Sequence, residues 1–197
     1  MRKTLYLAGF GYLAICGVIV LRHYARATPL RTGAPAAQPA GGGFDGSAQE
    51  WFAAMKPFCN AVEVELAQRG HPAPTTLEGQ GYSAACYALG GKIGEARRVI
   101  DGLPPDQRYG AVGIVFNVAH PVADAGDDRS AGPIMELVIA YWPNHYMALY
   151  HAGLSEFALG QPDLARKNLT AFLSYYHEDD GWTRSARETL ARLGVAR

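Results

Sequence analysis

The sequence predicts an all-α fold made of about three similar helix pairs, with further helices at each end. Three observations predict this fold. Glycines recur at intervals of 35 and 34 residues, at Gly91, Gly126 and Gly160. A small residue stands seven positions before each glycine, and an alanine stands five positions after it: Ala84, Ala119 and Gly153, then Ala96, Ala131 and Ala165. Apolar residues after each alanine follow helical spacing, which indicates an internal repeat of helical hairpins.

Residues 1–27 are predicted to form a membrane anchor. The stretch 5–21 holds seventeen uncharged, mostly apolar residues between basic flanks. As a helix it would be about 25 Å long, at the short end of what spans a bilayer. A cleaved signal or a lipid attached at Cys16 is the alternative, although Ile15 stands where a lipoprotein signal has a small residue. We expect a single-pass anchor with an exported, periplasmic or extracytoplasmic body.

A predicted linker follows the anchor, and the formal charge differs between the first 44 residues and the rest of the chain. Residues 28–46 are rich in Pro, Ala and Gly and lack hydrophobic periodicity, which is typical of a linker. The formal net charge of zero divides into +5 over the first 44 residues and −5 over the rest. An acidic body argues against nucleic acid as a partner.

The helical domain is predicted to cover 47–197. Ser47 and Glu50 match a capping box that starts a helix, and Pro57 ends or kinks this helix. Asn60 marks a second start, although the alternation of apolar and acidic residues over 62–66 also fits a strand. Cys59 and Cys86 lie on two neighbouring predicted helices, and either a disulfide or two buried thiols fits their spacing.

The third pair shows the repeat pattern most fully. A first helix begins at Tyr146 and carries Gly153 and Phe157, the residues 160–163 form a turn, and a second helix contains Ala165. These positions resemble the tetratricopeptide repeat (TPR) family, whose helical hairpin is about 34 residues long. Pro143 stands where that family ends its second helix. The resemblance covers about 77–172 and implies a right-handed α-solenoid that binds protein partners.

Three positions depart from the family pattern, and the last helix is predicted as a cap. Leu149 only loosely represents an aromatic residue of the first helix, and Pro121 falls inside a predicted helix. Pro121 and Pro133 together predict that the middle repeat is kinked or that its second helix starts late. The C-terminal helix opens near Asp180, and its apolar face covers the end of the stack. The residues of that face are Trp182, Ala186, Leu190 and Leu193.

Helical phase places a few aromatic and polar side chains on a concave surface. This predicted partner-binding surface consists of Phe116, His120, Asp124, Tyr150 and Phe157. An aromatic groove with a few polar groups suits a peptide or a partner helix. The remaining aromatic residues of 141–169 are predicted to be core.

The sequence contains no enzyme signature, and we expect neither a cofactor nor a metal. It lacks a GxSxG motif and a phosphate-binding loop. Two groups of acidic residues and histidines, one at 177–180, lack the spacing of known metal motifs, so solvated loops are the expected interpretation. The members of the other group are His120, Asp124, Asp127, Asp128 and His145.

The sequence therefore predicts a membrane-anchored interaction module without catalytic activity. We expect it to tether or stabilise a multi-subunit membrane complex of respiratory, photosynthetic or secretion type, with the bilayer contacted through 5–21. A transient assembly factor and a sensor of a small ligand are the alternatives, and a metal-dependent enzyme is the least favoured class.

Overall fold

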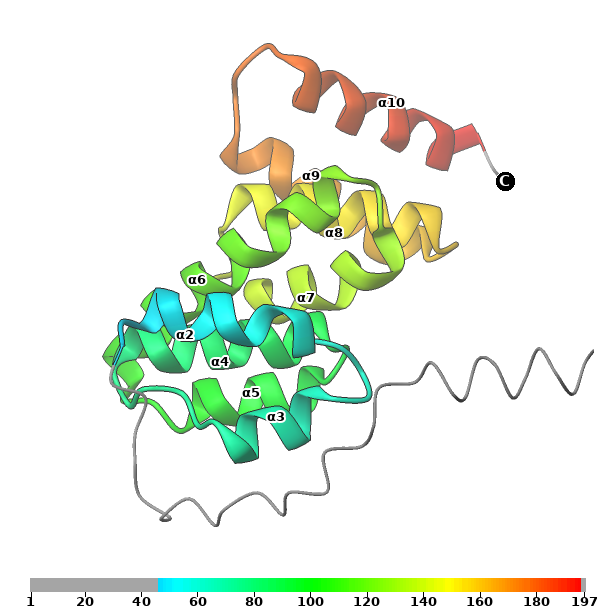
Figure 1. Ribbon diagram of the computed structural model, residues 1–197. Helices are drawn as coiled ribbons and strands as arrows, with labels where there is room; N and C mark the ends of the chain where they lie inside the picture. The colour runs from blue at the N-terminus through cyan, green and yellow to red at the C-terminus, as the bar shows by residue number, and fades with distance from the viewer. Residues whose placement is uncertain (1–45, 196–197) are drawn as a thin grey trace, which may run out of the picture. The chain divides into compact units, whose positions relative to one another are not determined.

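The computed structural model describes residues 46–195, and these residues contain nine α-helices, one short 3₁₀ helix and no β-strand (Figure 1). The all-α prediction is confirmed for this part of the chain. The predicted anchor and nearly all of the predicted linker lie outside the described residues. Among the described helices, none is both long and apolar enough to cross a bilayer.

The domain begins with short helices that pack beside the first pair. Helix α2 (Ala48–Met55) has the predicted capping box, with Ser47 and Glu50 each bonded to the other's backbone N–H. The 3₁₀ helix η1 (Lys56–Phe58) follows at Pro57, and α3 (Val64–Gly70) comes next. The strand interpretation of 62–66 is wrong because Asn60 accepts hydrogen bonds from the two backbone N–H groups ahead of α3.

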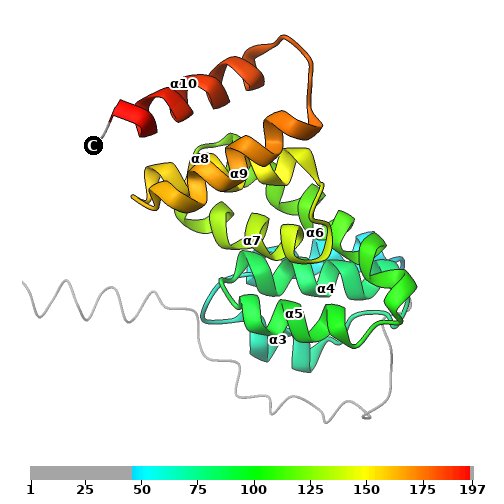
Figure 2. The same ribbon diagram turned by 180° about the vertical axis from the view of Figure 1, so that it is seen from behind.

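The middle of the domain consists of three consecutive helix pairs (Figures 1 and 2). In each pair a short turn joins two helices that pack together. Between pairs, α4 also packs on α6, and α7 on α8. The pairs are α4 (Leu77–Leu89) with α5 (Ile93–Asp101), α6 (Pro105–Asp124) with α7 (Asp128–Tyr141), and α8 (Tyr146–Ala158) with α9 (Pro162–Tyr175).

The three repeated glycines make the same turn. Gly91, Gly126 and Gly160 have φ of +71°, +77° and +73°, and within the described residues they are the only ones with positive φ. In each turn the glycine N–H and the following N–H donate to carbonyls of the helix's last turn, which is the Schellman arrangement. Only glycine adopts this left-handed conformation without steric cost.

The small residues of the repeat are buried, and one of them lies at a close approach of two helices. Ala96, Ala131 and Ala165 are completely buried. An added Cβ at Gly153 would lie 2.6 Å from Cγ of Leu169, so α8 and α9 approach too closely for a larger side chain. The repeated pattern thus selects both the turn and the separation of the helices that it joins.

The middle pair corrects one prediction. Helix α7 does not start late: it begins at Asp128, where Asp127 caps it by accepting from the Ser130 N–H, and Pro133 is its sixth residue. Helix α6 continues through Pro121 to Asp124. Its last turn is retained because the Ala125 N–H still donates to the Pro121 carbonyl at 3.1 Å.

The last helix, α10 (Gly181–Val195), contacts α9 and α8. Asp180 accepts from the N–H groups of Trp182 and Thr183 and thus caps the start, as predicted. Thr183, Ala186 and Leu193 are buried on it, whereas Trp182 is exposed. In the first turn of α10 the buried residue is therefore Thr183 and not the predicted Trp182. Trp182 lies against the ring of Tyr176.

A disulfide joins Cys59 to Cys86, and so ties the segment between η1 and α3 to α4. The two cysteines are 27 residues apart in sequence. They lie in a small core with Trp51, Met55 and Val64. A cross-link of this span restricts the unfolded chain and thereby stabilises the folded one.

We expect reduction of this disulfide, or the double change Cys59→Ala and Cys86→Ala, to lower the free energy of unfolding by about 3 kcal/mol. Urea unfolding of the full chain with and without reductant measures the loss. If the disulfide is what stabilises the oxidised chain, reductant should not change the stability of the double variant. Equal stability of the oxidised and reduced chains would contradict the disulfide.

We expect Gly160→Ala to lower stability by about 1 kcal/mol, because alanine pays a steric cost at positive φ. The matched control is Gly94→Ala, at a glycine in α5 with negative φ and open space around its Cβ position. That change is expected to be neutral or slightly stabilising. Thermal unfolding of the two variants compares them, and equal losses would argue against the turn as the cause.

Candidate functional site

An aromatic pocket lies where α6 meets the turn between α7 and α8. Pro143 lies in this turn, which follows the end of α7 and leads into α8 at Tyr146. The cavity has a volume of about 480 Å³. Its lining, which defines the aromatic pocket, consists of Gly113, Phe116, Asn117, Trp142, Asn144, His145, Tyr146 and Met147.

Ring contacts hold the aromatic side chains of the pocket in place. The ring of His145 lies 4.1 Å from that of Phe116 and 4.4 Å from that of Trp142, between centroids. Trp142 in turn lies 3.8 Å from Tyr109 of α6. Rings packed on several sides lose little further freedom when a ligand binds, so the pocket wall is preorganised.

His145 has a structural role at the start of α8. Its Nδ1 accepts a hydrogen bond from the Ala148 N–H at 3.2 Å and thus caps the helix. Burial lowers the pKa of His145, so its neutral form is favoured. With Nδ1 acting as acceptor, the neutral ring carries its proton on Nε2, which supplies one donor for a ligand.

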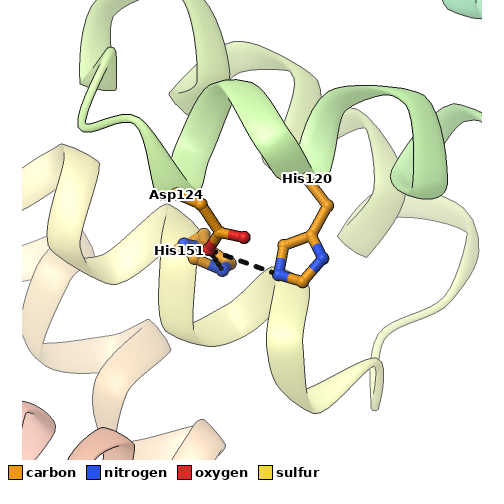
Figure 3. Close-up of side chains that lie close together, drawn as sticks. All are labelled: His120, Asp124 and His151. Carbon is orange, nitrogen blue, oxygen red and sulfur yellow. Dashed lines mark ion pairs between the residues drawn. The ribbon is translucent and has the colours of Figure 1, made fainter.

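A second group of polar side chains, the histidine–aspartate cluster, consists of His120, Asp124 and His151 (Figure 3). His120 and Asp124 are one turn apart at the end of α6, and His151 comes from α8. The Nε2 atoms of both histidines lie 3.6 Å from Oδ1 of Asp124. The three side chains therefore converge on one point between helices of different pairs.

The Nε2 atoms of the two histidines in this cluster lack a hydrogen-bond partner among the described residues. Within the described residues, Nε2 of His120 and Nε2 of His151 are buried and have no hydrogen-bond partner. Burial, together with repulsion from His120, lowers the pKa of His151 to about 4. His151 is thus neutral at pH 7, and its Nε2 is left without a partner from residues 46–195.

The five residues of the predicted partner-binding surface do not lie together in the structure. Phe116 lines the aromatic pocket and stacks on His120 at 4.8 Å. His120 and Asp124 meet in the histidine–aspartate cluster. Tyr150 is only 7% exposed and packs on Phe172, so it belongs to the core, and Phe157 is half-buried and does not line the pocket. Helical phase failed here because α8 is covered on both sides by neighbouring helices.

Neither of the two groups of acidic residues and histidines that the sequence suggested comes together as a complete cluster. Asp127 caps α7, Asp128 accepts from the Ser155 hydroxyl at 3.0 Å, and His145 faces the pocket. Asp180 caps α10 and accepts from the Tyr176 hydroxyl. Asp127, Asp128 and Asp180 are therefore each engaged in hydrogen bonds of their own rather than in a shared site.

Sequence reasoning missed most residues of these sites, among them Asn144, Trp142, Tyr146 and His151. The first three surround Pro143, and a signal was present because an aromatic-rich turn between repeats exposes its rings. For His151 no local signal exists, since it is a buried residue within an apolar stretch.

A buried carboxyl also lies on α8. Glu156 is almost completely buried and accepts hydrogen bonds from the Asn168 amide, which also donates to Glu136 at 2.8 Å. Burial, followed by the hydrogen bond and the charge of Glu136, raises the pKa of Glu156 to about 8. Glu156 therefore remains mostly protonated at neutral pH.

The chain matches no protein-family model, and the searches of curated proteins and of solved structures likewise found no similar protein. The functional argument therefore depends on the geometry of the two sites.

We expect the contribution of Glu156 to the stability of the domain to fall as pH rises from about 4.5 to about 8, because the unfolded chain releases the Glu156 proton at its ordinary pKa and the folded chain retains it. Glu156→Gln keeps a neutral group in place. It should raise stability at pH 8 by about 1 to 2 kcal/mol and have little effect near pH 4.5.

Urea unfolding across this pH range measures the effect. The matched control is Glu188→Gln, at an exposed glutamate of α10, which should leave the pH dependence unchanged. A gain from Glu156→Gln that is the same at all pH values would contradict the raised pKa.

Proposed function

We propose that this protein is a membrane-tethered, non-catalytic interaction module whose aromatic pocket binds a segment of a protein partner. The observation that carries the proposal is the pocket itself: rigid aromatic walls, two amide side chains and a volume of about 480 Å³ at the surface. Such a combination suits a short peptide with an apolar anchor residue, because rings bury the anchor and amides pair with the peptide backbone.

The arrangement of the helices supports a TPR-like, right-handed α-solenoid. Three helix pairs follow one another, and each has a glycine turn of the same conformation. Repeated hairpins of this kind stack their neighbours and leave surfaces between pairs for partners. The aromatic pocket occupies such a position, between the second pair and the start of the third.

The disulfide supports an exported body. Disulfides persist in oxidising compartments such as the periplasm and are rare in the reducing cytosol. With an anchor at residues 5–21 and a linker over 28–46, the module would be held near the outer face of a membrane. Its partner would then be a subunit of a membrane complex, and the module would tether or stabilise that complex or take part in its assembly.

The volume of the pocket favours one second candidate. A cavity of about 480 Å³ lies within the range that holds small molecules, so a sensor of a small ligand is the alternative. The two candidates differ in what co-purifies. A partner of fixed stoichiometry supports the interaction module, whereas a chain recovered alone that melts higher with a bound small molecule supports the sensor.

We expect Tyr146→Ala to reduce recovery of the partner at least about tenfold, because aromatic anchors dominate binding energy at interfaces. Tyr146 lines the pocket and is 40% exposed. Tyr175→Ala is the matched control, since Tyr175 is 53% exposed and does not line the pocket.

The measurement is gentle detergent extraction of the full-length chain with a photocrosslinking residue at position 144, followed by mass spectrometry. The same partner peptide should be cross-linked in the wild type and in Tyr175→Ala, and lost in Tyr146→Ala. Equal cross-linking in all three chains would exclude the pocket as the binding site.

A further inference from the structure

We propose that His120, Asp124 and His151 bind one divalent transition-metal ion of the zinc type. This site goes beyond the proposed function and does not depend on the partner. The set consists of two imidazole nitrogens and one carboxylate oxygen, all within 4.8 Å of one another. Nitrogen-rich sets of this kind favour ions such as Zn²⁺ over Mg²⁺ and Ca²⁺, which prefer oxygen.

Two of the three ligand separations are close to those around a zinc ion. Ligand atoms about 2.0 to 2.1 Å from a tetrahedral zinc ion are about 3.3 Å from each other. Both histidine nitrogens lie 3.6 Å from Oδ1 of Asp124, so two of the three separations require adjustments of only a few tenths of an ångström. At 3.6 Å these contacts are too long for good hydrogen bonds, so the carboxylate does not satisfy either nitrogen.

The cost of the arrangement without an ion also points to a ligand. His151 is only 6% exposed, and its Nε2 points into the cluster with no partner among the described residues (Figure 3). A buried polar atom without a hydrogen bond destabilises a protein unless something pairs with it. A metal ion bound to Nε2 would supply the missing partner.

The cluster is open on one side. The side chain of Asp124 is 59% exposed, so an ion can enter there from solvent. Three protein ligands leave at least one coordination position, which water can fill. The charge is also suitable, because Asp124 adds a carboxylate to the two imidazoles.

The position of the ion gives it a mechanical role. His120 and Asp124 belong to the second helix pair and His151 to the third, so a bound ion would join the two pairs. Phe116 stacks on His120 and also lines the aromatic pocket. An ion held by His120 would therefore fix one wall of the pocket.

The test is zinc titration of the full-length chain, purified in detergent without a histidine tag and stripped with a chelator. Calorimetry should show one zinc ion per chain, and Mg²⁺ should not compete. Zinc should also raise the melting temperature, because an ion that binds only the folded state stabilises it. Absence of zinc binding would overturn the proposal.

Asp124→Asn and His120→Gln should each weaken zinc binding by at least about 10- to 100-fold and abolish the thermal shift. Both positions are partly exposed, so the variants should fold, and their circular dichroism and zinc-free melting temperatures check this. His177→Gln is the matched control, at an exposed histidine beside acidic residues. Zinc binding that is the same in Asp124→Asn and in the wild type would place the ion elsewhere and overturn the site.

Discussion

The left-handed glycine turn is the constraint on which the rest of the structure depends. Each helix pair reverses direction within a few residues, and the carbonyls that the first helix leaves unpaired are satisfied by the N–H of the turn glycine and of the residue after it. A side chain at this position would oppose the turn, so glycine is favoured at Gly91, Gly126 and Gly160. Because the turn is the same each time, the second helix of each pair leaves in a similar direction. Small residues of the repeat also limit how far paired helices stand apart, as the approach of Gly153 to Leu169 shows.

Both candidate sites follow from this constraint at the second turn. Gly126 can close its turn only if α6 remains helical to Asp124, and α6 does so although Pro121 removes one backbone N–H. That last turn carries His120 and Asp124 on one face, four residues apart, which are neighbouring positions on a helix. The third pair then brings His151 against them, and the ring of Phe116 one turn earlier reaches the aromatic pocket. A change at the turn would therefore alter the cluster and the pocket together.

Helix α8 concentrates unusual polar groups in an otherwise apolar interior. His151 and Glu156 are both buried, and both are held in their neutral forms, one with a lowered and one with a raised pKa. They differ in how they are satisfied. The Glu156 carboxyl accepts a hydrogen bond from the Asn168 amide. Its hydrogen bonding is therefore satisfied, which indicates a structural role. Nε2 of His151 has none among the described residues, and this difference is the reason to regard the histidine–aspartate cluster, rather than the carboxyl pair, as a binding site.

The sequence by itself determined the all-α class, the capped start at Ser47 and the three glycine turns, because capping and left-handed turns are local and are recorded in a few adjacent residues. It also singled out His120, Asp124 and Phe116, since residues on one helix have fixed relative positions. The tertiary structure alone decided that Tyr150 is core, that Trp142 and Tyr146 wall the pocket, and that His151 completes the cluster. These outcomes depend on how α8 packs between its neighbours, and that packing is the sum of many weak contacts across pairs that no local pattern records.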